Sequence, residues 1–218
     1  IKTNFGTGDI TSKKSIMQIK ILSILAYWLL TIFSIIFILI STSLKATNVK
    51  NSAVVFMYHK FDKSKYPSTN ITLEQFESHL QELSKSKYNV KSIDYIVDNI
   101  INDASLPENT IGISVDDADK SFLEVAWPRF KKFGFPVVLF VSTKTIAPGN
   151  NNYLSWDEIR LLRDEGVTIG AHSHSHNHYP EMTLEQIQED IETSNKIFLK
   201  ELGKTPNLFA FPYGEANN

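Results

Sequence analysis

Cysteine is absent from this 218-residue sequence. Disulfide bonds and thiolate ligands are therefore excluded, and any bound metal ion must be held by histidine and carboxylate side chains. The sequence also lacks a long basic run, and its formal net charge is only −2. Because binding to a phosphate backbone depends on a positively charged surface, we expect no nucleic acid partner.

The N-terminal segment differs in composition from the rest of the chain. Residues 1–16 are polar and aperiodic, and we interpret them as disordered or upstream sequence, with Met17 as a candidate start. No charged residue occurs from Ile21 to Leu44, and three lysines precede this run, namely Lys13, Lys14 and Lys20. A basic stretch followed by an apolar run is typical of segments that direct a protein to a membrane.

The apolar run is longer than the roughly 20 residues that span a bilayer, which favours a retained anchor. A cleaved signal peptide is the alternative, because Leu44-Lys45-Ala46 offers a weak small-residue cleavage site. A buried core helix is disfavoured, since the run has no polar face. We therefore expect residues 17–46 to be a signal peptide or membrane anchor, residues 47–52 a linker, and the remainder extracytoplasmic.

From residue 53 onwards, β-rich runs alternate with helical patterns. The expected strands are Ala53–Tyr58, Val90–Ser92, Thr110–Val115, Pro136–Val141, Val167–Ala171 and Leu208–Phe211. The expected helices begin at Thr72, Ser92, Ser121, Ser155 and Thr183, and three of them end near Gly134, Gly166 and Gly203. Such alternation predicts parallel strands joined by helical crossovers, with residues 53–218 forming one α/β domain.

Polar residues follow three of these strands. Asp116-Asp117 follows the strand at 110–115, a histidine-rich stretch follows 167–171, and Pro212-Tyr213-Gly214 follows 208–211. In α/β barrels the functional groups lie at this carboxyl rim, which favours a barrel. An open doubly wound sheet is the alternative, but no glycine-rich phosphate loop follows any strand to support it.

The histidine-rich stretch holds four of the six histidines within seven residues: His172, His174, His176 and His178. Neutral imidazoles are good ligands for zinc-like divalent ions, and two of them need a carboxylate from elsewhere to complete a site. A polar surface loop rich in histidine and serine is the alternative interpretation.

The adjacent acids Asp116 and Asp117 are the candidates for that carboxylate. Neighbouring residues at a strand end point in different directions, so one can bind a metal ion while the other holds a proton. Acids also favour helix N-termini without any catalytic role, and this interpretation suits Asp119. A calcium loop starting at Asp117 is excluded, because Phe122 stands where its glycine is required and Pro128 where its glutamate is required.

Together, Ile113-Ser-Val-Asp-Asp117, Ile169-Gly-Ala-His-Ser-His-Ser-His176 and Phe209-Ala-Phe-Pro-Tyr-Gly214 resemble three ordered motifs of the polysaccharide deacetylases, the NodB-homology family of carbohydrate esterases. With Met57-Tyr58-His59, they are most similar to the branch that deacetylates poly-N-acetylglucosamine. The resemblance implies a distorted (β/α) barrel and metal-dependent removal of N-acetyl groups from a polysaccharide.

The resemblance also implies roles for individual residues. Asp116 would be the general base, and Asp117, His172 and His176 would be the ligands of a divalent ion, with zinc as the first candidate. The backbone N–H of Tyr213 would bind the oxyanion. A shift of two residues would select His174 and His178 instead, since their spacing is the same; the family match favours His172 and His176.

Three residues depart from the family pattern. Val115 and Ala118 stand where Phe and Gly are common, and we expect these changes to affect packing only. Ala210 replaces an arginine that orients the base in many members, so Asp116 must be held in another way. His59 could line the cleft, whereas His79 lies in the middle of a helix and is expected to be structural.

Two other functions are compatible with the sequence. One is a non-catalytic protein that binds glycan on the same barrel, and the other is a small-molecule amidohydrolase. The chain ends shortly after the Pro212–Gly214 turn, and the family takes its general acid from a histidine in a later motif. We therefore expect that this polypeptide is incomplete and weakly active by itself, unless His59, His174 or His178 supplies the acid.

Overall fold

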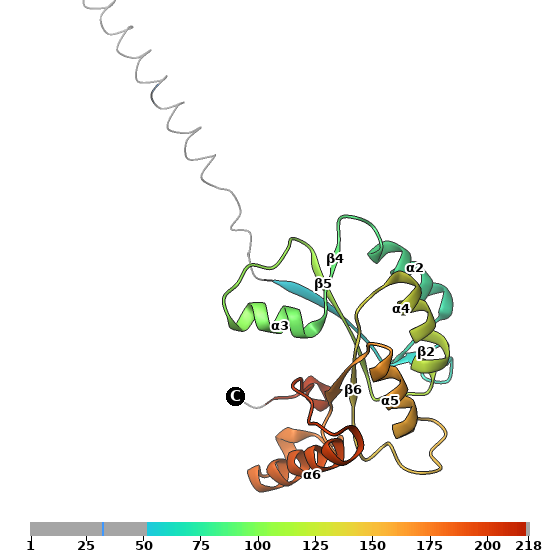
Figure 1. Ribbon diagram of the computed structural model, residues 1–218, viewed down its shortest axis with the longest axis vertical. Coiled ribbons are helices and arrows are strands. Elements are labelled where there is room, and N and C mark those ends of the chain that lie inside the picture. The colour runs from blue at the N-terminus through green and yellow to red at the C-terminus, as the bar shows by residue number, and fades with distance from the viewer. Residues whose placement is uncertain (1–31, 33–51, 217–218) are drawn as a thin grey trace, which may run out of the picture. The chain divides into compact units, whose positions relative to one another are not determined.

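The computed structural model describes residue 32 and residues 52–216. Its centre is a parallel sheet with strands in the order β1 (Ala53–Tyr58), β5 (Thr110–Asp116), β6 (Val138–Val141) and β7 (Thr168–Ala171). The short strand β4 (Asn89–Val90) pairs with the first two residues of β5. Strands β2 (Lys60–Phe61) and β3 (Asn70–Ile71) form a separate parallel pair. Figure 1 shows the main sheet with helices on either side of it.

The helices begin at the capping residues that the sequence indicates, except for the helix at residues 127–133, which follows Ala126 and not Ser121. They are α2 (Leu73–Leu83), α3 (Ile93–Ile101), α4 (Trp127–Phe133), α5 (Trp156–Asp164) and α6 (Leu184–Leu202). Thr72, Ser155 and Thr183 each form a capping box, in which side chain and backbone satisfy each other's hydrogen bonds. Gly134 and Gly203 end α4 and α6 in the left-handed conformation that glycine adopts without strain.

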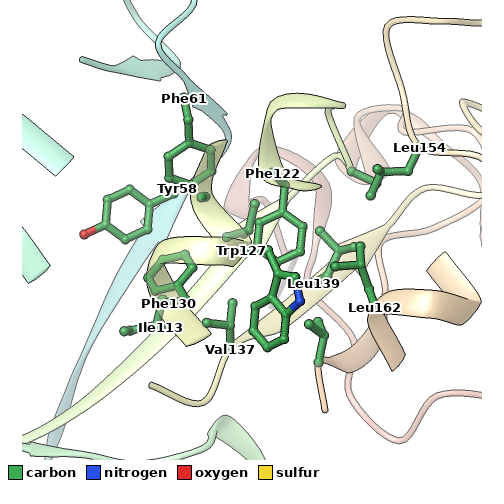
Figure 2. Packing of buried hydrophobic residues seen from close by; sticks show 14 of the residues in the cluster. Tyr58, Phe61, Ile113, Phe122, Trp127, Phe130, Val137, Leu139, Leu154 and Leu162 are labelled. Atoms are coloured by element: carbon green, nitrogen blue, oxygen red, sulfur yellow. The ribbon is translucent and has the colours of Figure 1, made fainter. Parts of the chain in front are cut away.

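Both faces of the sheet are covered, as the alternation along β6 demonstrates. Leu139 and Val141 point into the larger core, which includes Phe76 of α2 and Phe130 of α4. Val138 and Phe140 point the other way, into a smaller cluster with α3. Figure 2 shows the larger core, in which the aromatic rings of Tyr58, Phe61, Phe122, Trp127 and Phe130 gather beside the strands. A strand buried on both faces explains the continuous apolar run in its sequence.

The prediction of a barrel is only partly correct. The fold is α/β with parallel strands, but within the described residues the sheet has five strands and stays open. A closed (β/α) barrel needs about eight strands. At the open side, Val54 and Met57 of β1 are 59% and 60% exposed.

The predicted strand Leu208–Phe211 is wrong as a strand. It forms a single parallel bridge, between Phe209 and Ala171, flanked by hydrogen bonds from Ala171 N–H to the Leu208 carbonyl and from Ala210 N–H to the Ala171 carbonyl. Pro212 has no N–H with which to extend the pairing, and the chain turns into the 3-10 segment η3 (Pro212–Gly214). The segment nevertheless lies beside β7, as the strand prediction required.

The predicted helix from Ser121 to Lys132 is also interrupted. It consists of the π-helical segment η1 (Phe122–Ala126) followed by α4. Trp127 N–H donates to the Phe122 carbonyl, five residues earlier. Because Pro128 cannot donate a backbone hydrogen bond, the preceding turn widens instead of continuing as an α-helix.

Within the described residues, no helix is long and apolar enough to cross a membrane. The predicted hydrophobic helix and anchor at Ile21–Leu44 lies, apart from Ile32, outside those residues. Membrane association and the domain boundaries before residue 52 therefore stay predictions.

Candidate active site

The carboxyl ends of β5, β6 and β7 meet at one edge of the sheet. Asp116, the last residue of β5, is in register with Phe140, and Val141 is in register with Ala171 at the end of β7. Asp117 and His172 follow their strands directly, so the parallel pairing brings two distant parts of the sequence to the same place.

Asp117 lies between two imidazole rings. Its Oδ1 atom is 3.1 Å from His176 Nε2 and 3.7 Å from His172 Nε2. Asp117 itself has φ 71°, a left-handed conformation directly after the last residue of β5. Each of the three residues offers one ligand atom, and these atoms lie within 4.8 Å of one another. One carboxylate oxygen and two imidazole nitrogens therefore converge on a point.

The ring of His172 is oriented by the backbone. Its Nδ1 lies 2.8 Å from the carbonyl oxygen of Ala210. Since a carbonyl only accepts, Nδ1 carries the hydrogen and Nε2 is left with a free lone pair facing Asp117. Burial lowers the pKa of His172, which favours the neutral ring that a metal ion requires.

His176 is held by both its backbone and its side chain. Its N–H donates to Ser173 Oγ at 2.9 Å, and its φ is 58°. The hydrogen bond to Asp117 raises the pKa of His176. Burial raises the pKa of Asp117, but the hydrogen bond and charge of His176 outweigh it and lower the pKa overall. These opposite shifts favour a protonated His176 beside a charged Asp117, and a divalent cation would have to displace that proton to bind there.

Asp116 is chemically different from its neighbour. It is 5% exposed, and its Oδ1 atom is buried without a hydrogen-bond partner among the described residues. Burial, together with the charge of Asp117, raises the pKa of Asp116 to about 7. A buried carboxylate oxygen that lacks a hydrogen bond, next to a carboxylate–imidazole cluster, fits a site that receives a cation and a water molecule. The donor set of Asp117, His172 and His176 fits a zinc-like ion.

The other two histidines of the stretch face elsewhere. His174 Nδ1 lies 2.8 Å from Thr143 Oγ1. His178 Nδ1 lies 2.8 Å from Glu215 Oε2, and its ring stacks on Tyr213 at 3.8 Å and 9°. The two-residue shift considered above does not bring His174 and His178 to Asp117.

The sequence around this site matches a known family over half of the chain. The family model described as polysaccharide deacetylase matches residues 103–218. The chain belongs to the polysaccharide deacetylase family. The matched region includes Asp116 and Asp117, the histidine stretch and the Pro212–Gly214 turn.

Two relatives from bacteria bear the name of polysaccharide deacetylases. The chain is 23% identical over 163 residues to the putative polysaccharide deacetylase YxkH of Bacillus subtilis strain 168, covering 75% of this chain and 57% of that protein. It is 24% identical over 198 residues to the poly-beta-1,6-N-acetyl-D-glucosamine N-deacetylase of Staphylococcus aureus strain MSSA476, covering 78% of this chain and 67% of that protein. The chain thus spans little more than half the length of the first relative.

The fold also matches a solved structure. IcaB from Ammonifex degensii superposes with a TM-score of 0.67 and 21% sequence identity, covering 77% of this chain and 76% of that chain. At this identity the similarity establishes the fold, an α/β arrangement with a parallel sheet.

The departures from the polysaccharide deacetylase pattern have visible consequences. Ala118 has φ 57°, a conformation that glycine adopts freely and that costs other residues roughly 1 kcal/mol, so this substitution affects the backbone as well as packing. Ala210 brings no cation to Asp116, consistent with the unpaired Oδ1. Its backbone carbonyl instead fixes the ring of His172.

His59 is closer to the site than the sequence indicates. It follows β1 directly, and its charge acts on Asp117 and His172, while the charges of Asp117 and His176 act on it. Burial lowers the pKa of His59 overall. His79, by contrast, hydrogen-bonds Tyr58 Oη at 3.1 Å, in agreement with its expected structural role. His59 thus lies within electrostatic range of Asp117, His172 and His176 but offers no ligand atom to their cluster.

Proposed function

We propose that this protein is a metal-dependent hydrolase that removes N-acetyl groups from an N-acetylglucosamine-containing polysaccharide. The proposal rests on two neighbouring carboxylates that lie in unlike environments. Asp117 is paired with two imidazoles, whereas Asp116 is buried and its Oδ1 has no hydrogen-bond partner among the described residues. Neighbouring acids whose pKa values are pushed apart are suited to different tasks in one reaction.

The residues Asp117, His172 and His176 would hold the ion. A divalent ion such as zinc, held by three protein ligands, lowers the pKa of bound water to about 7 and polarises a carbonyl group. Asp116 would accept a proton from the water molecule that attacks the acetyl carbon. Because burial raises the pKa of Asp116 towards neutrality, its carboxylate is a stronger base than an exposed aspartate.

The oxyanion formed at the acetyl carbon needs a hydrogen-bond donor. We assign this role to the backbone N–H of Tyr213. Pro212 and Gly214 hold Tyr213 at φ 57°, and its ring packs edge-on against His176 at 4.8 Å. A backbone donor in a fixed turn costs little reorganisation when charge develops.

The departing amine needs a proton, and we assign His59 as its donor. His59 is half-buried, its pKa responds to the charges of Asp117 and His176, and it is not part of the ligand set. Burial lowers the pKa of His59, so its imidazolium is the minor form at neutral pH; that form would release a proton to the amine nitrogen as the C–N bond breaks, leaving acetate and a free amine. The sequence-based expectation of an acid beyond residue 218 stays a prediction, and His59 is the candidate that we propose within this chain.

Replacing His59 by glutamine should therefore lower kcat by on the order of 100-fold without loss of metal, since general acid catalysis is worth at least that much. His79→Gln is the matched control, because His79 bonds Tyr58 and takes no part in the cluster. Turnover and metal content are measured on both. Near-normal turnover in His59→Gln would remove His59 from the mechanism.

The polysaccharide substrate is supported by the relatives. The Staphylococcus aureus relative is by name an N-deacetylase of poly-beta-1,6-N-acetyl-D-glucosamine. A polymeric substrate also agrees with the predicted extracytoplasmic location, which rests on the segment at residues 17–46 alone.

The decisive experiment is release of acetate from a short N-acetylglucosamine oligomer by the full chain, with and without a chelator. We expect slow turnover that the chelator abolishes and added Zn²⁺ restores. Turnover on N-acetylglucosamine monomer alone would indicate the small-molecule amidohydrolase. Oligomer binding without turnover would indicate the non-catalytic glycan-binding protein.

A further inference from the structure

The loop that carries the two histidine ligands has no regular secondary structure to hold it. His172 and His176 are four residues apart, a spacing that brings side chains together on a helix. Here they lie in a loop after β7, and two of its residues, Ser173 and His176, adopt left-handed backbone conformations with φ 65° and 58°. Such conformations persist only where the surroundings impose them. Something other than local preference must therefore set the distance between the two rings.

Asp190 of α6 is bonded to the middle of this loop. Its Oδ2 accepts the N–H of His174 at 2.8 Å, and its Oδ1 accepts the N–H of Ser175 at 2.8 Å. The hydroxyl of Tyr179, which follows the loop, donates to Oδ2 at 3.1 Å. Asp190 is 7% exposed, so these bonds form away from solvent. Hydrogen bonds to a carboxylate are shorter and stronger than those between neutral groups.

A second residue of the same helix supports the same loop. Ser194, one turn after Asp190, donates from Oγ to the carbonyl of Ser173 at 3.3 Å. Ser173 in turn accepts the N–H of His176 through its own Oγ at 2.9 Å. Asp190, Ser194 and Phe198 form the buried face of α6, where apolar residues would otherwise be expected. Two polar residues on a buried stripe thus both act on the histidine loop.

We infer that Asp190 is a positioning residue that sets the geometry of the metal site by fixing the loop between His172 and His176. Among the described residues it has no hydrogen bond with either ligand ring, and it is bonded to the backbone of the residues between them. The inference rests on the metal-binding role proposed above. Its consequence is that metal affinity depends on a carboxylate that is not itself a ligand, as it does on supporting residues in other metal sites.

The test is the affinity of the full chain for Zn²⁺, measured by competition with a chromophoric chelator. Asp190→Asn keeps the size of the side chain but replaces one acceptor by an N–H₂ group, which faces a backbone N–H. We expect Zn²⁺ affinity to fall about 10- to 100-fold. Glu189→Gln removes the same charge from the adjacent, exposed position of α6 and should bind as the wild type does. Tyr179→Phe leaves both backbone bonds in place and should have a smaller effect than Asp190→Asn.

Thermal unfolding of the metal-free variants separates positioning from general stability. A folded Asp190→Asn that binds Zn²⁺ as tightly as the wild type, whatever its melting temperature, would overturn the inference. If that variant does not fold, Asp190→Glu replaces it, and wild-type affinity there has the same meaning, because the longer side chain displaces the carboxylate. Absence of Zn²⁺ binding by the wild type would overturn the proposed function as well. If His176→Ala loses Zn²⁺ binding and Asp190→Asn does not, only the positioning role is overturned.

Discussion

Asp117→Ala, His172→Ala and His176→Ala should each bind Zn²⁺ far more weakly than the wild type and should lose deacetylation. Each removes one of the three ligand atoms that lie within 4.8 Å of one another. Two remaining ligands cannot hold a zinc-like ion at the coordination that catalytic sites use. The loss should exceed the roughly 10- to 100-fold that removal of a merely supporting residue costs. Metal content by mass spectrometry after dialysis is the direct measurement.

His178→Ala is the matched control for this series. It removes a histidine from the same stretch, but one whose ring bonds Glu215 and stacks on Tyr213. We expect it to retain metal. Loss of metal in His178→Ala together with retention in His172→Ala would contradict the assignment and favour the shifted ligand pair.

The fold was predictable where local chemistry determines it. Capping residues such as Thr72 and Ser155 give the helix starts, and β-branched runs give the strands, because both depend on residues within one turn or one strand. The errors lie where a distant partner is needed. Whether Leu208–Phe211 becomes a strand depends on the residues it meets, and it meets only Ala171 before Pro212 ends the pairing.

The site was predictable as a set of residues but not as a geometry. Spacing and family resemblance selected Asp117, His172 and His176, and the structure places their donor atoms together. The orientation of His172 by the Ala210 carbonyl depends on a backbone contact across 38 residues, which no sequence pattern records. The sequence does contain a signal for Asp190, because a charged residue on the buried stripe of α6 breaks the helical pattern around it.

Asp116→Asn should retain metal and fold yet lose about 10²–10⁴ in kcat, the usual contribution of a general base. Asparagine has nearly the same shape, and Asp116 is not within the ligand cluster. The amide cannot accept the proton of the attacking water, so only transition-state stabilisation by other groups remains. Acetate release at saturating Zn²⁺, with metal content measured on the same samples, tests this. Near-normal turnover would exclude Asp116 from the mechanism.

The same substitution should stabilise the metal-free protein, in a manner that depends on pH. Burial raises the pKa of Asp116 from 3.8 to about 7, so the folded state disfavours the charged carboxylate. The buried carboxyl group therefore costs the wild type no stability below about pH 4, where it is protonated in both states, and an increasing amount as the pH rises towards 7. An asparagine side chain in its place carries no charge at any pH and has no such cost. Each pKa unit corresponds to about 1.4 kcal/mol, so the gain at pH 8 should be on the order of a few kcal/mol. Chemical denaturation in the presence of a chelator, at pH 4 and pH 8, measures this difference. A variant less stable than the wild type at pH 8 would mean that Asp116 has a partner in the folded protein, and the case for a poised base would fail with it.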